Sequence, residues 1–130
     1  MENKTEKNNL IREKTFKFSL QIIVLYKQLK DQNEYVLSKQ ILRSGTSIGA
    51  NVEEATAAQS RKDFISKMSI ASKEARETNY WLRLLRDSKL CKDIDYDHYI
   101  GKCEELIKIL TSIVKTSQKT LNPKNLKTKI

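Results

Sequence analysis

The chain has 130 residues and a formal net charge of +9, from 25 basic and 16 acidic side chains. Its length fits one domain, because domains commonly hold roughly 100–200 residues. Three glycines and one proline are too few for a turn-rich all-β architecture, which needs both residues in quantity. The composition therefore excludes that class and leaves enough apolar residues for a single core.

The sequence shows no targeting or membrane signal. The opening residues are polar, and the longest apolar run is 22–26, far short of the ~20 residues of a membrane-spanning helix. Cys91 and Cys103 lie twelve residues apart without the spacing of a metal site. Because no secretion signal accompanies them, we expect reduced thiols, a cytoplasmic protein and no contact with a membrane.

Apolar periodicity predicts the first helix over about 13–31. We expect residues 1–12, which precede the pattern, to form a flexible N-terminal segment. One stripe at helical spacing is predicted to face the core: Phe16, Leu20, Ile23, Tyr26 or Lys27, and Lys30. Further apolar residues widen this face: Ile22, Leu25 and Leu29.

A second helix is predicted over about 35–59, after the polar run 31–34. Its apolar positions are Leu37, Ile41, Ile48, Val52 and Ala55. The stretch 44–49 has two glycines and three hydroxyl residues, and each glycine costs about 1 kcal/mol of helix propensity relative to alanine. Either the helix kinks there or tertiary packing overrides propensity. We favour packing, with the small residues admitting a neighbouring helix.

Two more helices are predicted over about 61–87 and 95–118. Ser60 followed by Asp63 is typical of a helix start. The core positions of the third helix are Phe64, Met68, Ala71, Ala75, Thr78, Leu82 and Leu85, and those of the fourth are Tyr99, Cys103, Leu106, Leu110, Ile113 and Ser117. Four such helices predict an all-α, antiparallel, up-down-up-down four-helix bundle over residues 13–118.

Positive charge is concentrated at the C-terminal end. Residues 115–130 contain five lysines and no acidic residue, which accounts for more than half of the excess. We therefore expect 119–130 to be a Lys-rich disordered tail. The bundle itself is only mildly basic.

A polar strip runs along the second helix. At 100° per residue its five members share about 80° of the helix surface, and Glu77 on the third helix is a partner for them. Arg43–Glu77 or Lys73–Glu54 ion pairs would satisfy both sides. We favour a structural network between helices or subunits over a ligand or RNA site. The strip consists of Gln40, Arg43, Ser47, Asn51 and Glu54.

The segments YVLSKQILRSGTSIGANVEEA (35–55) and DFISKMSIASKEARETNYWLRLL (63–85) resemble the 23S rRNA intervening-sequence protein family of bacterial four-helix bundles. The resemblance covers about 14–114, and the polar strip with Glu77 coincides with the family signature. It implies an all-α bundle that assembles as a homo-oligomer, often a ring-like homopentamer. A related branch looks like the accessory protein of diversity-generating retroelements, which associates with a reverse transcriptase and nucleic acid.

The favoured function is RNA binding by the third helix, whose basic residues outnumber its acids by three. Cations would contact phosphates and Tyr80 would stack on unpaired bases, whereas Trp81 is expected to fill a seam. The alternative is a protein–protein interaction module or scaffold without nucleic acid, and a nucleic-acid-processing protein is another possible partner. The candidate RNA-binding residues are Arg61, Lys62, Lys73, Arg76, Tyr80, Arg83 and Arg86.

No catalytic constellation is apparent in the sequence. His98 is the only histidine, and no Glu-x-x-His pair, Cys-x-x-Cys motif, phosphate loop or nucleophile–base couple can be assembled. We therefore expect a protein without catalytic residues, metal or cofactor.

Overall fold

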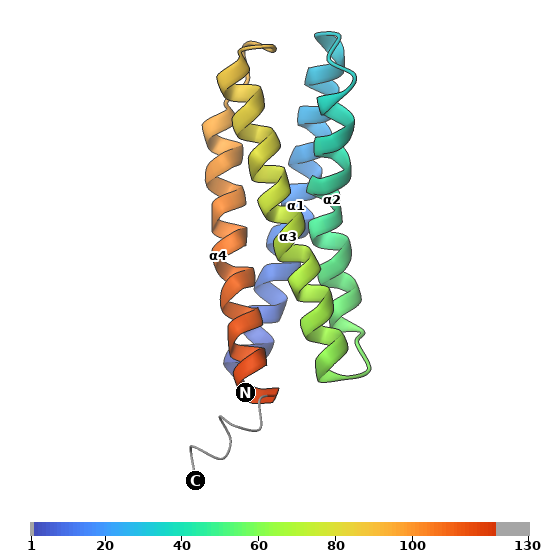
Figure 1. Ribbon diagram of the computed structural model, residues 1–130, viewed down its shortest axis with the longest axis vertical. Coiled ribbons are helices and arrows are strands. Elements are labelled where there is room, and N and C mark those ends of the chain that lie inside the picture. Colours follow the sequence, from blue (N-terminus) through green and yellow to red (C-terminus); the bar gives the residue numbers. More distant parts are fainter. Residues whose placement is uncertain (1, 122–130) are drawn as a thin grey trace.

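The protein is an all-α four-helix bundle. The structure is a computed structural model that describes the backbone of residues 2–121 and the side chains of 5–121. Successive helices run in opposite directions along one long axis (Figure 1), as predicted. The helices are α1 (Glu2–Asp31), α2 (Leu37–Thr56), α3 (Arg61–Ser88) and α4 (Tyr96–Leu121).

Each helix packs against two others. Helices α1 and α3 each contact both α2 and α4, and within the described chain α1 and α3 do not contact each other. They therefore occupy diagonal corners of the bundle, with α3 in front of α1 in the view of Figure 1. The outer surfaces of α1 and α3 consequently face opposite ways.

Side-chain caps fix where the middle helices begin. The Oγ of Ser60 accepts a hydrogen bond from the Asp63 backbone N–H at 3.0 Å, so the predicted start of α3 is confirmed. At the start of α2 the carboxylate of Glu34 accepts the Ser38 N–H at 2.7 Å. Both contacts satisfy donors that a helix N-terminus leaves unpaired. Helix α3 ends where Lys89 adopts a left-handed backbone conformation, φ 58°.

The prediction of a flexible segment over residues 1–12 is wrong from Glu2 onward, because α1 begins there. Ile11 is completely buried and extends the core stripe of α1 by another turn. The Nζ of Lys7 donates a hydrogen bond to Ser112 Oγ of α4 at 2.8 Å. Residues 2–9 are polar, so apolar periodicity could not reveal a turn held partly by polar contacts.

The core stripe of α1 also differs from the prediction. Phe16, Leu20 and Ile23 are exposed, with 64% of Phe16 accessible to solvent. They lie nearly opposite the buried face, since 100° per residue separates the two stripes by roughly 140–180°. Helix α1 thus has two apolar stripes, and periodicity alone does not indicate which one faces inward. The buried stripe is Ile11, Thr15, Phe18, Ile22, Leu25 and Leu29.

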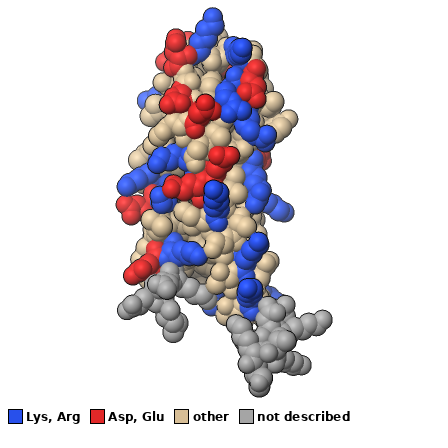
Figure 2. Space-filling view, turned by 90° about the vertical axis from the view of Figure 1, so that its left-hand side faces the viewer, with Lys and Arg blue, Asp and Glu red and all other residues tan. Residues whose placement is uncertain are grey.

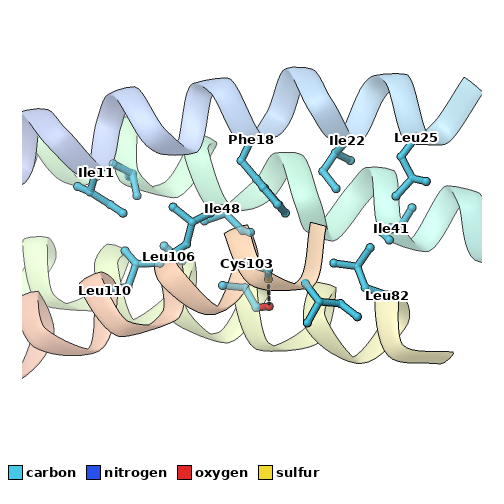
Figure 3. Packing of buried hydrophobic residues seen from close by; sticks show 14 of the residues in the cluster. Ile11, Phe18, Ile22, Leu25, Ile41, Ile48, Leu82, Cys103, Leu106 and Leu110 are labelled. Atoms are coloured by element: carbon cyan, nitrogen blue, oxygen red, sulfur yellow. Dashed lines mark hydrogen bonds between the residues drawn. The ribbon is translucent and has the colours of Figure 1, made fainter. Parts of the chain in front are cut away.

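The predicted core positions of the other helices are largely confirmed. Leu37, Phe64 and Tyr99 are only partly buried and lie at the margin of the core, while the remaining members are buried. Figure 3 shows side chains of all four helices meeting along the bundle axis. The Cys103 thiol donates to the Ala75 carbonyl at 3.1 Å, and burial raises the pKa of this thiol to about 12.

Helix α2 is continuous through the glycine-containing stretch. A Cβ at Gly49 would lie 3.3 Å from the Thr15 carbonyl oxygen of α1, so the backbones of α1 and α2 approach closely. This confirms close packing as the reason for small residues there. Of the predicted disordered tail, 119–121 form the last turn of α4, and the rest lies outside the described residues. None of the described helices has both the length and the apolar composition of a membrane crossing.

Candidate nucleic-acid interface

Five of the seven candidate RNA-binding residues lie together on one exposed strip of α3. At 100° per residue they share about 80° of the helix surface, and the strip follows α3 for roughly 30 Å at 1.5 Å per residue. All five are exposed. We call this strip the α3 basic face: Lys62, Lys73, Arg76, Tyr80 and Arg83.

Within residues 5–121, the cations of the α3 basic face form no ion pairs. Among the described residues, none of its four cationic groups lies within 4.0 Å of a carboxylate oxygen. Arg76 instead donates to the Thr111 hydroxyl of α4 at 3.1 Å, and Arg83 donates to Asn79 Oδ1 at 2.9 Å. The guanidinium groups of Arg76 and Arg83 are thus held in place by neutral acceptors, which do not balance their positive charge.

Tyr80 supplies an exposed aromatic ring beside these cations. Its side chain is 49% exposed, and the Arg83 guanidinium carbon lies 6.0 Å from the ring centroid. Trp81 is only partly exposed and packs against the core, as expected for an aromatic that fills a seam. The two rings meet edge to face with centroids 5.3 Å apart, which fixes the ring of Tyr80 next to the partly buried indole.

Two candidate residues lie apart from the α3 basic face. Arg86 is occupied by two carboxylates, with its Nε at 2.8 Å from Asp87 Oδ1 and its Nη1 at 2.9 Å from Asp97 Oδ1. These contacts raise the pKa of Arg86 and remove it from the set of free cations. Arg61 lies at the end of the bundle, where it lines a cavity of about 370 Å³ together with Lys7 and Phe64.

Helix α4 extends the basic surface in a way that the sequence analysis missed. Lys108 and Lys115 are exposed and lie three residues before and four residues after Thr111, hence on the same side of α4. The Arg76–Thr111 hydrogen bond places that side next to the α3 basic face. Figure 2 shows the α4 side of the bundle, with Lys and Arg side chains following one another down its right-hand edge.

The polar strip of α2 forms the outer seam between α2 and α3. Arg43 bridges two glutamates of α3: its Nη1 lies 3.1 Å from Glu74 Oε2, and its Nη2 contacts the Glu77 carboxylate. The predicted Arg43–Glu77 pair is therefore present, and Glu74 is an additional partner. Glu54 pairs with Lys67 at 2.9 Å instead of with Lys73, so Lys73 remains unpaired on the outer side.

Glu77 connects this seam to the aromatic pair. Its carboxylate accepts the indole N–H of Trp81 at 3.0 Å and also binds Arg43. The pKa of Glu77 is held below its ordinary value mainly by the hydrogen bond from Trp81 and then by the hydrogen bond from Arg43. The pKa of Arg43 is raised, mainly because of its hydrogen bond to Glu77. One arginine opposite two glutamates leaves a net negative charge at this point.

The remaining members of the strip are satisfied within α2. Ser47 Oγ donates to the Arg43 carbonyl at 2.6 Å, and Asn51 Nδ2 donates to the Ser47 carbonyl at 2.8 Å. Both side chains are half-buried, whereas Gln40 is exposed. The contacts of Arg43, Ser47, Asn51 and Glu54 thus support the structural interpretation, since each lies within α2 or between α2 and α3.

The described residues offer no grouping of three or more His, Cys, Asp or Glu side chains suited to a metal ion. Cys91 and Cys103 are both free and buried, and burial raises the pKa of each thiol. A buried thiol with a raised pKa carries little thiolate and is a poor nucleophile.

Comparison with known proteins identifies related chains. Residues 7–112 match the model of the family described as 23S rRNA-intervening sequence protein. A crystal structure of a protein with unknown function from the S23 ribosomal protein family of Bacteroides thetaiotaomicron superposes with a TM-score of 0.80 at 50% sequence identity, covering 84% of this chain and 98% of that one. Among curated proteins, none matches the chain.

Proposed function

Because the chain belongs to the 23S rRNA-intervening sequence protein family, we propose that it is a non-enzymatic, homo-oligomeric RNA-binding protein that holds RNA on the α3 basic face. The observation that carries this proposal is the set of exposed α3 cations that have no carboxylate oxygen within 4.0 Å among the described residues. Elsewhere on the bundle, cations such as Arg12 and Lys14 are paired with Glu53 and Glu105. Unbalanced cations along one helix are natural contacts for a phosphate backbone.

Tyr80 favours RNA with unpaired bases over a double helix. An exposed ring flanked by a guanidinium provides a stacking surface, and stacking of a base on an aromatic ring contributes about 1–3 kcal/mol. Bases in a duplex are stacked on one another and cannot use such a ring. We therefore propose loops, bulges or single strands as the preferred RNA.

A triple substitution tests the proposal. Changing Lys73, Arg76 and Arg83 to glutamine removes three cations from the α3 basic face. Affinity for a structured RNA with an unpaired loop, measured by filter binding at low salt, is expected to fall at least tenfold. The slope of log K against log salt is expected to fall by about 2, because each phosphate contact to single-stranded nucleic acid contributes about 0.7.

The matched control is a second triple variant that lowers the net charge by the same amount outside the α3 basic face. Lys39, Lys92 and Lys102 are exposed and without ion pairs among the described residues, and their triple change to glutamine is expected to preserve most of the affinity. Equal losses in both variants would assign the affinity to overall charge. Failure of the wild-type protein to retain RNA at low salt would remove the proposal altogether.

A protein-interaction module is the second candidate, and one observation favours it. The outer stripe of α1 leaves Phe16, Leu20 and Ile23 exposed on a helix that has no further neighbour in the bundle. A contiguous apolar stripe on a surface indicates contact with a partner. Binding of a nucleic-acid-processing protein, as the resemblance to retroelement accessory proteins implies, belongs to this candidate. Capture of such a protein without RNA affinity would favour it over the first.

A further inference from the structure

A cavity lies at the end of the bundle that holds the first turns of α1 and α3 and the last turns of α4, the lower end in Figure 1. Its volume is about 370 Å³, which is within the roughly 300–1,000 Å³ of most small-molecule sites. At ~30 Å³ for each water-sized group, this volume corresponds to roughly a dozen such groups. The cavity is therefore large enough for a small organic molecule.

The cavity forms because the core stripes of α1 and α4 become polar at this end. On α1, Lys7 and Asn8 precede the buried Ile11 by four and three residues, so they lie on the same side of the helix. On α4, the buried Ile113 is followed one turn later by Ser117. Protein cores are normally filled to high density by large apolar side chains. Short or polar residues at these positions leave part of the last core layer unfilled.

Ser117 is the residue that points to a ligand in this cavity. Its side chain lines the cavity although the residue is only 2% exposed, and its hydroxyl makes no hydrogen bond with the described residues. Thr15 and Thr120 donate to the carbonyl four residues earlier in their helices, whereas Ser117 does not. Buried hydroxyl groups in folded proteins nearly always have a hydrogen-bond partner. A polar group inside the cavity would satisfy this one.

The charged groups in the described lining of the cavity are both cationic. Lys7 donates to the neutral hydroxyl of Ser112 at 2.8 Å, and Arg61 makes no ion pair among residues 5–121. No aspartate or glutamate belongs to the described lining. Because hydrogen bonds from a guanidinium to a carboxylate are stronger than those to a neutral acceptor, this lining favours an anionic group over a neutral or cationic one.

The other part of the lining is apolar, since Phe64 and Ile113 both contribute to it and both pack in or against the core. Apolar walls with a few polar groups are typical of small-molecule sites. We propose that this cavity binds a small carboxylate with an apolar body, of about ten non-hydrogen atoms in all. The carboxylate accepts hydrogen bonds from the Arg61 guanidinium and the Ser117 hydroxyl. The apolar body lies against Phe64 and Ile113.

A series of probes with one alkyl chain and different charge tests the proposal on the full chain. Octanoate, octanol and octylamine are titrated by calorimetry, and the methyl resonances of Ile113 are followed by NMR. Octanoate is expected to bind about tenfold more tightly than octanol and to shift the Ile113 resonances, because only its charged group pairs with the guanidinium. Octylamine is expected to bind more weakly than both. The proposal is overturned by an octanoate titration without saturation, and equally by octanol or octylamine that binds as tightly as octanoate.

Two substitutions place the carboxylate in the cavity. Arg61→Gln is expected to lower the affinity for octanoate about tenfold, and Ser117→Ala about threefold, as for the loss of one hydrogen bond. Ser117→Ala should not lower the thermal midpoint of the protein without octanoate, because the hydroxyl it removes has no partner among the described residues. The matched control is Lys119→Gln, which removes one exposed cation at the same end of the bundle but outside the cavity. Equal losses in Arg61→Gln and Lys119→Gln would overturn the site.

The cavity site is independent of RNA binding by the α3 basic face. Arg61 lies apart from that face, so saturating octanoate is expected to leave the retention of RNA unchanged. A wild type that binds octanoate but no RNA would remove the proposed function and support the cavity site. An RNA that displaces octanoate would assign the cavity to RNA phosphate and overturn the proposal of a small carboxylate. Circular dichroism checks that every variant remains helical.

Discussion

Gly45 of α2 packs directly against the side chain of Ile22 of α1 and leaves no room for a Cβ atom at position 45. A Cβ at position 45 would stand 2.9 Å from both Cγ1 and Cγ2 of Ile22. Ile22 is completely buried and β-branched, so its side chain has few alternative rotamers. Together with Gly49 one turn later, Gly45 allows α1 and α2 to pack backbone to backbone in the middle of the bundle.

Gly45→Ala is expected to destabilise the protein by about 1–2 kcal/mol, because overpacking against Ile22 outweighs the ~1 kcal/mol gain in helix propensity. Gly101→Ala provides the matched comparison. Gly101 lies in α4, where an added Cβ meets nothing within 4 Å, so the same substitution should raise stability by about 0.5–1 kcal/mol. Urea unfolding of both variants measures the difference, and a stabilised Gly45→Ala protein would contradict the close approach.

Ile11 and Leu10 test where α1 begins. Ile11 is completely buried, whereas Leu10 is 44% exposed. Ile11→Ala is expected to lower the free energy of unfolding by about 2–4 kcal/mol, as for other buried large-to-small changes. Leu10→Ala should change it by less than about 1 kcal/mol. Similar small effects at both positions, measured by thermal unfolding, would show that this part of the chain does not pack on the bundle.

Glu77→Gln is expected to destabilise the protein at neutral pH by about 1 kcal/mol, a value reduced for its partial exposure to water. The Glu77 pKa is lowered in the folded state from an ordinary value of 4.5. Its contribution is therefore complete above that pH and disappears as pH falls through the lowered pKa. The difference between wild type and variant, followed by denaturant unfolding from pH 7 to pH 3, should shrink below about pH 4.5.

Glu104→Gln is the control for that pH series. Glu104 is exposed and makes no ion pair among the described residues. Its replacement should leave the pH dependence of unfolding close to that of the wild type. A Glu77→Gln difference that stays constant down to pH 3 would mean that the Trp81 and Arg43 contacts do not depend on the charge of Glu77.

The fold could be predicted because three of the helices carry one clear apolar stripe each. On α3, for example, Met68, Ala71 and Ala75 are buried as their spacing indicates. Helix α1 was the exception, since Phe16, Leu20 and Ile23 form a second stripe that competes with the true core stripe. A face that is apolar and exposed has the same periodicity as a buried one, so a single helix in isolation cannot distinguish them.

Predicting the candidate site was limited by contacts between helices. Sequence alone placed Arg86 among the candidate RNA-binding residues, but the fold brings Asp97 of α4 within 2.9 Å of its guanidinium. The pairing of Glu54 with Lys67 in preference to Lys73 likewise depends on the relative rotation of α2 and α3. Charge composition indicates which helix is basic, whereas the partners of each cation emerge only from packing.

The order in which the helices contact one another also bears on how the chain folds. Every helix packs against its neighbour in sequence, and α1 with α4 is the one pairing that joins distant segments of the described chain. Folding of such a topology involves little loop-closure entropy before contacts form, and helical bundles of low contact order fold in microseconds to milliseconds. The helical hairpins α1–α2 and α3–α4 can therefore collapse independently, leaving the α2–α3 and α1–α4 contacts to close the bundle.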